Sequence, residues 1–256
     1  MVDDAIRMDI DRGASMGRLS RRIPAGLRAR IRQVHASIYE LAGSDRHSRP
    51  SLHGIEDRLD TLLDHPGFFV EAGAFNGFDQ SNTYWLERFR GWRGLLVEPL
   101  PREAKRARDV RRRETVVSSC ALGPPELDGQ TVTIRYAGLM SITSRAMDDS
   151  QAAKHIDAGV EVQGLSGTFE VEVLCRTLTG VLEAAGAPRH IGLLSLDVEG
   201  FEVSVLRGLD VSRFRPQFVM VESKHSPDLD GQLRSMGFSC ADPDFTPNDV
   251  LYRMDD

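Results

Sequence analysis

Four acidic residues stand directly after short apolar stretches, where they could bind a small polar ligand. Glu71 ends FFVE, Glu98 ends GLLVE, Asp197 ends IGLLSLD and Glu222 ends QFVMVE. If these stretches are parallel strands, the acids meet at the carboxyl edge of one sheet, which carries the ligand crevice in doubly wound folds. Carboxylates at such an edge can bind an ammonium group, accept ribose hydroxyls or hold a divalent cation.

A turn with two glycines follows the first of these acids, in the segment VEAGAFNG at residues 70–77. Gly73 and Gly77 would let the backbone approach a ligand closely, facing the first amides of the next helix. The G-x-x-x-G spacing differs from the G-x-G-x-x-G pattern of dinucleotide-binding proteins. An acid before the turn suits an ammonium group better than a pyrophosphate, and S-adenosylmethionine carries an ammonium group and no phosphate. A purely structural turn is the alternative.

The two later acids could prepare a hydroxyl group for reaction. Asp197 and Glu222 could hold Mg²⁺ through their oxygens and so lower the pKa of a bound hydroxyl. The alternative is a structural carboxylate pair without metal. His225 is the candidate general base, since an unperturbed histidine pKa of about 6.5 suits proton transfer near neutral pH. A solvated loop histidine is the alternative for His225.

An alternation of apolar strands and helices from residue 67 onward must position these groups. We expect strands at 68–71, 94–98, 115–122, 169–174, 191–197 and 217–222, and helices at 81–89, 101–113, 178–185, 203–209 and 229–236. This order predicts an α/β fold with a mostly parallel, doubly wound sheet and helices on both faces. Strands at 238–240 and 250–253 would form an antiparallel C-terminal edge hairpin. Residues 123–170, with a strand-like piece at 131–136, interrupt the alternation as an expected insertion or lid over the active face.

Residues 1–66 are expected to form a leader and a helical extension before a catalytic domain at 67–256. One face of an amphipathic helix is formed by Ile23, Leu27, Ile31, Val34, Ile38 and Leu41. Seven arginines and no acid lie between Asp11 and Glu40. The helix could pack in a homodimer or touch an anionic membrane surface. Packing is favoured, because the apolar stripe lacks the Trp and Phe of interfacial helices.

Composition excludes several other classes of protein. The chain has 256 residues, of which 41% are hydrophobic and 27% charged, as in ordinary globular domains. Its three cysteines form no CxxC motif, which argues against a disulfide framework or a zinc site and leaves the cytoplasm as the expected location. No apolar run is long enough for a membrane span. The net charge of −6 arises within residues 195–256, which disfavours nucleic acid as the substrate.

Taken together, these motifs resemble the FkbM family of methyltransferases, a branch of the Rossmann-like S-adenosylmethionine-dependent enzymes. The resemblance is carried by VEAGAFNG (70–77), SNTYWLE (81–87), GWRGLLVEP (91–99), CALG (120–123), CRTL (175–178), LSLDVEGFEVSVLRG (194–208) and RPQFVMVE (215–222). It spans about residues 67–253. Many relatives have asparagine where this chain has Phe75, with Asn76 following, which resembles a GAFDG-type subgroup.

The resemblance implies a class I methyltransferase fold with a seven-stranded sheet, and a role for each matching position. Glu71, Gly73 and Gly77 would line the methionine part of S-adenosylmethionine, with Phe75 and Asp197 also at the cofactor. Glu98 would hold the ribose, and Ser119, Cys120 and Ala121 would flank the adenine. Asn76 would contact the cofactor or shape the turn, while Ser81 and Asn82 would cap a helix or reach the cofactor carboxylate. Cys120 also fits a small buried hydrophobe.

The implied reaction is O-methylation of a hydroxyl on a glycosyl or secondary-metabolite acceptor. Asp197, Glu222 and His225 are the expected catalytic residues, with a divalent cation such as Mg²⁺ as a further expectation. Two alternatives stay open at this point. One is an NAD(P)-dependent oxidoreductase on a Rossmann-like fold, and the other is a non-catalytic module that binds a partner.

Overall fold

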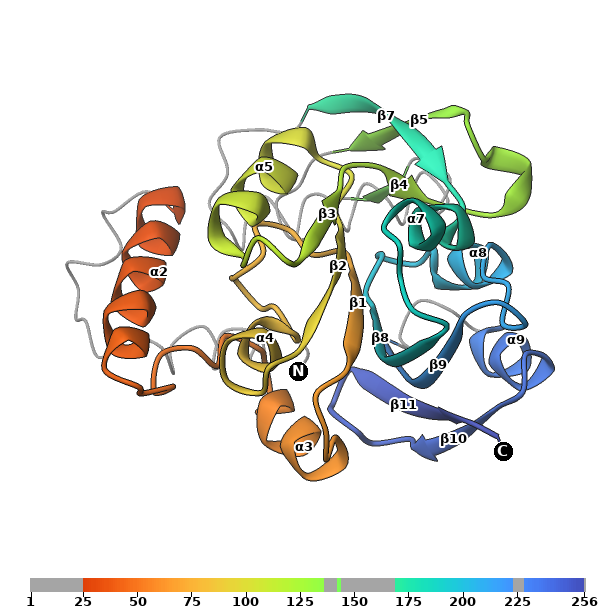
Figure 1. Cartoon of the computed structure of the whole chain (residues 1–256). Helices are drawn as coiled ribbons and strands as arrows, with labels where there is room; N and C mark the ends of the chain where they lie inside the picture. Colours follow the sequence, from red (N-terminus) through yellow and green to blue (C-terminus); the bar gives the residue numbers. More distant parts are fainter. Residues whose placement is uncertain (1–24, 136–141, 144–168, 223–227, 256) are drawn as a thin grey trace.

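The central element is a seven-stranded sheet with helices on both faces (Figure 1). The computed structural model describes residues 25–135, 142–143, 169–222 and 228–255. The strand order is β10-β11-β9-β8-β1-β2-β3. The strands are β1 (Phe68–Ala72), β2 (Arg93–Val97), β3 (Val116–Ser118), β8 (His190–Leu196), β9 (Arg215–Glu222), β10 (Phe238–Asp242) and β11 (Asp249–Met254). Five strands run parallel, and β11 lies antiparallel between β9 and β10, so the expected mostly parallel sheet with an antiparallel edge is confirmed.

Two apolar layers fix the helices to this sheet. One layer joins Phe69, Leu193 and Phe218 of the sheet to the helices α3 (Ile55–Leu62), α4 (Tyr84–Phe89) and α5 (Pro101–Val110). The other joins Val70, Leu194 and Val219 to α7 (Leu178–Ala184), α8 (Glu202–Arg207) and α9 (Leu229–Ser235). Neighbouring strand residues point to opposite faces. Strands buried on both faces therefore appear in the sequence as continuous apolar runs.

A second, four-stranded sheet corrects part of the expected arrangement. Its order is β4-β7-β5-β6, from β4 (Ala121–Leu122), β5 (Thr131–Arg135), β6 (Ile142–Thr143) and β7 (Glu170–Arg176). The expected single strand at 115–122 is wrong. It divides after Ser118, because Ala121 and Leu122 pair with β7 instead of continuing beside β2. A short 3₁₀ helix, Pro125–Leu127, follows β4. Most of the predicted lid, at 136–141 and 144–168, lies outside the described residues.

The topology singles out one point on the carboxyl edge of the large sheet. From β1 the chain proceeds outward through β2 and β3, whereas β8 and β9 extend from the other side of β1. The order therefore reverses between β1 and β8, and open α/β sheets bind their ligands at such a switch point. Glu71 and Ala72 of β1 pair with Ser195 and Leu196 of β8, so the two strands end side by side.

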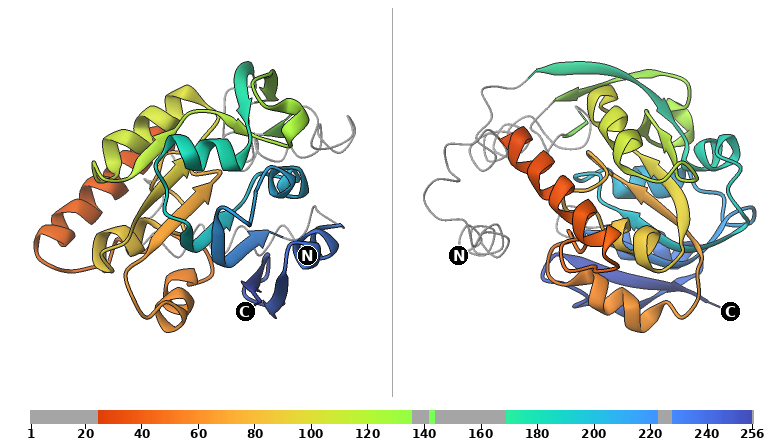
Figure 2. Two further views of the ribbon diagram at one scale, coloured as in Figure 1. Left: turned by 45° about the vertical axis from the view of Figure 1, so that its right-hand side comes forward. Right: turned by 60° about the vertical axis from the view of Figure 1, so that its left-hand side comes forward.

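The remaining helix, α2 (Ala25–Leu41), stands at the periphery of the fold and covers neither face of the large sheet (Figures 1 and 2). It confirms the amphipathic helix expected from the spacing of its apolar residues. Among the described helices, none has the length and apolar character that a membrane crossing requires.

Candidate functional site

The turn after β1 is bonded to the ends of both neighbouring strands. The amides of Gly73 and Ala74 donate to the Val97 carbonyl at 3.0 and 3.2 Å. On the other side, the Asp197 amide donates to the Ala72 carbonyl at 3.1 Å. The ends of β2, β1 and β8 are therefore held as one unit at the switch point.

The two glycines of this turn are required by contacts within the protein. Gly73 has φ +85°, and a Cβ there would lie 1.9 Å from the backbone oxygen of Asp197. Gly77 has φ +77°, and its Cβ would lie 2.9 Å from Cα of Ala107 on α5. Both positive φ angles and both close approaches favour glycine. The structural alternative therefore explains both glycines, and Gly73 in addition keeps its backbone exposed to solvent.

We expect Gly73→Ala to destabilise the protein by at least 2 kcal/mol more than Gly237→Ala. Gly237 has φ +86°, and its nearest neighbour would lie 3.9 Å from an added Cβ, so both variants carry the same left-handed backbone cost. The difference then measures the clash with Asp197, which needs a backbone shift of a kind that costs about 1–3 kcal/mol or more. Urea unfolding of both variants measures it. Equal losses would show that the two turns are not tightly packed.

Glu71 lies inside a buried network and does not face a ligand. Its side chain accepts hydrogen bonds from the hydroxyls of Ser81 (2.9 Å) and Thr83 and from the amide of Asn82 (2.8 Å). The Arg111 guanidinium forms an ion pair with it at 2.8 Å, and both side chains are buried. The expected contact with the cofactor ammonium group is therefore not available to this carboxylate, because its oxygens are enclosed and bonded within the protein.

Three polar residues that were expected near the cofactor shape the loop before α4. Asn76 accepts the amides of Phe78 and Asp79 at 3.0 and 2.9 Å, so its side chain shapes the turn. The Ser81 hydroxyl accepts the Tyr84 amide at 3.1 Å and so caps α4. The Asn82 side chain donates to the Ser195 hydroxyl at 3.1 Å, which links this loop to β8.

Glu98 is a buried acid at the end of β2. It accepts the amides of Phe75 and Leu100 at 2.8 and 2.9 Å, and it is 4% exposed. Phe75 itself has a φ of +45°, an uncommon value for a side chain of its size. Desolvation raises the pKa of Glu98 to about 7, against the two amide hydrogen bonds that lower it. This carboxyl group therefore changes its charge near neutral pH.

The residues expected at the adenine stand between the two sheets. Ser119 is exposed, whereas Cys120 and Ala121 are buried in the core cluster that includes the second sheet. Burial raises the pKa of the Cys120 thiol, and its sulfur lies 3.4 Å from the Ser118 hydroxyl. Cys120 thus occupies the position of a small buried hydrophobe, as the sequence allowed.

Three carboxylates converge beyond the ends of β8 and β9. Asp197, Glu199 and Glu222 each offer an oxygen, and these atoms all lie within 4.8 Å of one another. Glu199, two residues after Asp197, adds a third carboxylate to the pair that the sequence predicted. It adopts a φ of +54°, in a turn where the Glu202 carboxylate accepts the amides of Val198 (3.3 Å) and Gly200 (3.0 Å).

Within this carboxylate trio (Asp197, Glu199 and Glu222), Asp197 is perturbed by its surroundings and by the other two charges. Protein atoms surround the Asp197 carboxyl group on most sides, although its surface remains accessible to solvent. This desolvation, followed by the charges of Glu199 and Glu222, raises the pKa of Asp197 well above its ordinary value. Strong shifts in a group that solvent can reach are typical of functional sites. The arrangement fits a hard cation with oxygen ligands, or a positively charged group of a ligand.

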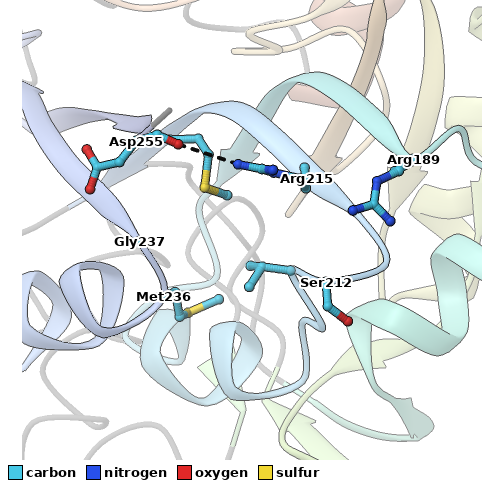
Figure 3. A pocket seen from close by; sticks show the side chains of 8 residues that line it. Arg189, Ser212, Arg215, Met236, Gly237 and Asp255 are labelled. Carbon is cyan, nitrogen blue, oxygen red and sulfur yellow. Dashed lines mark hydrogen bonds between the residues drawn. The ribbon is translucent and has the colours of Figure 1, made fainter.

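Two further features limit what belongs to the site. His225, the expected base, lies outside the described residues. A depression of about 330 Å³ lies near the amino ends of β8 and β9, at the opposite edge of the sheet (Figure 3). There Arg215 donates to the Asp255 carbonyl at 3.4 Å, and Arg189 stands nearby. This depression is therefore separate from the carboxyl-edge site.

Comparisons with known proteins identify the family of the chain. The family model described as the methyltransferase FkbM domain matches residues 71–245. No curated protein matches the chain. A crystal structure of methyltransferase FkbM from Methylobacillus flagellatus KT is similar at 15% identity with a TM-score of 0.45. The match covers 87% of this chain and 54% of that protein, so the chain spans about half of that protein's length.

Proposed function

Because the chain belongs to the FkbM family of methyltransferases, we propose that it transfers a methyl group from S-adenosylmethionine to a hydroxyl of a glycosyl or secondary-metabolite acceptor. Family membership supports a methyltransferase activity. One observation supports the donor above all others. The ends of β1, β2 and β8 are bonded together at the switch point, around the exposed backbone of Gly73.

The residues at this point fit the parts of the donor. S-adenosylmethionine supplies a methyl group on a sulfonium ion. Glu98 would hold the ribose, since each of its oxygens accepts one backbone amide and can accept one further hydroxyl. The backbone from Gly73 to Phe75 would border the methionine part, and Ser119 to Ala121 the adenine. Glu71 would support the turn through its bonds to Ser81 and Asn82 instead of touching the donor.

Titration with S-adenosylhomocysteine tests this assignment. We expect calorimetric binding with a dissociation constant below millimolar, and no competition from NADH. Binding of NADH in its place would favour an oxidoreductase, and binding of neither would favour a module that holds a partner. Either result would overturn the proposed donor.

The affinity for S-adenosylhomocysteine should depend on pH through Glu98. With a pKa of about 7, this side chain is increasingly protonated below neutral pH and loses its capacity to accept two ribose hydroxyls. We expect the dissociation constant to rise by up to about tenfold per pH unit below pH 7. Glu98→Gln should bind more weakly at pH 8 and lose this dependence.

Glu56→Gln is the matched control for that experiment. Glu56 is also buried, its pKa is also raised by desolvation, and its partner is Ser51, in the linker before α3. The Glu56 variant should keep the pH dependence of the wild type. Retention of the dependence in Glu98→Gln would remove Glu98 from the ribose site.

The carboxylate trio and His225 would act on the acceptor. Asp197, Glu199 and Glu222 would hold a divalent cation such as Mg²⁺, which lowers the pKa of a bound hydroxyl. Their convergence within 4.8 Å supports this proposal. His225 would take up the hydroxyl proton, a proposal that rests on its place in the sequence three residues after Glu222.

His225→Ala should leave binding of S-adenosylhomocysteine unchanged and slow turnover by about 10²–10⁴-fold, the usual contribution of a general base. Turnover is measured as donor-dependent methylation across a panel of hydroxylated glycosides. His190→Ala is the control, because His190 begins β8 at the opposite edge of the sheet. Unchanged turnover in His225→Ala would exclude His225 as the base.

A further inference from the structure

Helix α2 turns its apolar side chains away from the protein to which it is attached. Ile31, Val34, Ile38 and Leu41 are 44%, 55%, 58% and 90% exposed. Only three other large apolar residues are exposed in the parts of the chain that the structure describes. A surface helix of a monomer normally directs its apolar stripe toward the core. The orientation of α2 is the reverse.

The opposite side of α2 is fixed to the domain by polar bonds and one small residue. Glu40 accepts the hydroxyls of Ser48 at 2.6 Å and Tyr84 at 2.9 Å. Arg32 pairs with Asp79 at 2.7 Å, and Ala36 is fully buried in a small cluster with Tyr84. These contacts define which side of the helix faces the domain. They leave the seam of Ile31, Val34, Ile38 and Leu41 directed outward.

The spacing of the seam is that of a helix pairing with another helix. Its residues follow one another at intervals of three, four and three, the a and d positions of successive heptads. Ile31 and Ile38 occupy a, and Val34 and Leu41 occupy d. Apolar residues at both a and d form the continuous seam that two pairing helices bury between them. Such a seam is complementary to a copy of itself.

We propose that α2 forms an antiparallel, two-fold symmetric dimer contact with α2 of a second copy of this chain. In this arrangement Ile31 packs against Leu41 of the second copy, and Val34 against Ile38, so the four exposed residues are all covered. Two-fold symmetry closes the assembly at two chains.

The charge distribution along α2 selects this orientation. Arginines lie in its first half, and no basic residue lies between Tyr39 and Ser44. Antiparallel packing places Arg30 of one copy near the carboxyl end of the other helix, where the helix dipole favours a cation. Parallel packing would bring the arginines of both copies together. A helix of 17 residues offers a small interface, so we expect a dimer that dissociates on dilution.

Sedimentation and light scattering of the full chain test the contact. At about 100 µM we expect twice the chain mass of 28.4 kDa, falling toward the monomer on dilution. Ile38→Glu should be monomeric throughout. At a dilution where the wild type is also monomeric, its thermal unfolding midpoint should equal that of the wild type, because Glu is a good helix former and Ile38 is exposed. Leu174→Glu, at an exposed apolar residue of β7, is the control and should still dimerise.

Cysteine substitutions test the orientation. Residues 31 and 41 are about 15 Å apart along one helix, too far for a disulfide within a chain. The double variant Ile31→Cys, Leu41→Cys should therefore form disulfide-linked dimers, and Leu41→Cys alone should not. Efficient linkage of the single variant would overturn the antiparallel arrangement.

Other occupants of the seam give different results. A full chain that stays monomeric at 100 µM overturns the proposal. If deletion of residues 1–22 then produces dimers, the chain's own first residues cover the seam. If Ile38→Glu instead abolishes binding to phosphatidylglycerol vesicles, the seam contacts a membrane.

Discussion

Arg111→Met is expected to lower the free energy of unfolding by about 3–5 kcal/mol, the cost of leaving a buried charge without its partner. The side chain of Arg111 is fully buried and contacts Glu71 at 2.8 Å and Glu87 at 3.3 Å. It also donates to the Gly77 carbonyl at 2.8 Å. Methionine fills similar space but neutralises neither carboxylate. Urea unfolding measures the loss.

Two further variants show whether the loss comes from the ion pair. Arg108→Met changes an exposed arginine one turn earlier, whose bond in the described structure is to the Val117 carbonyl, and should cost less than about 1 kcal/mol. Adding Glu71→Gln to Arg111→Met should restore at least 1 kcal/mol, because the unpaired charge is then removed. If the double variant loses as much free energy of unfolding as the two single variants together, the ion pair does not explain the loss in Arg111→Met.

Asp197→Asn is expected to reduce turnover by about 10² or more, if the carboxylate trio holds a cation that polarises the acceptor hydroxyl. The same variant also distinguishes a cation site from a structural group of carboxylates, in an experiment that needs no methyl acceptor. Mg²⁺ at saturating concentration should raise the thermal unfolding midpoint of the wild type by several degrees, because a ligand that binds the folded state stabilises it. The midpoint of Asp197→Asn should not respond to Mg²⁺.

Without a cation, Asp197→Asn should be more stable than the wild type at pH 8. The pKa of Asp197 is raised in the folded state by desolvation and by Glu199 and Glu222. Protonated Asp197 makes its full contribution to folding stability at pH values below the pKa that it has in the unfolded chain. This contribution is lost as the pH rises through the higher pKa of the folded state. The asparagine variant avoids this loss, so the difference should shrink as the pH is lowered.

Glu114→Gln is the control for net charge. Glu114 is exposed and lies between α5 and the start of β3, at the opposite edge of the sheet from the trio. It should change neither turnover nor the response to Mg²⁺. An equal response to Mg²⁺ in Asp197→Asn and in the wild type would show that the trio is a structural cluster.

The sheet edge was predictable from sequence, because apolar runs that end in an acid fix both the strand and its carboxyl end. The role of Glu71 was not. It depends on Arg111, which is forty residues away and lies just after α5, and no local spacing encodes that ion pair. The break after Ser118 was hidden for a similar reason. The run TVVSSCAL is continuous as a pattern, and only the distant strand β7 draws its second half into another sheet.

Glu199 shows a third kind of limit. Glu199 lies three positions beyond β8. The direction of its side chain depends on a positive φ angle and on the bonds of Glu202, neither of which follows from residue type. The sequence therefore located the edge but not the third member of the trio.

The pairing of β5 with β7 has a consequence for how far the segment between these two strands could vary. Arg135 and Glu170 pair in register at the open end of this ladder and form an ion pair at 3.0 Å. The two ends of the segment between Arg135 and Glu170 are therefore held together, and β6, within that segment, pairs with Ile134 and Arg135. The entropy cost of closing such a loop grows only with the logarithm of its length. A longer or shorter segment could therefore replace residues 136–169 at little cost in closure entropy, provided that it supplies a strand to pair with β5 in place of β6.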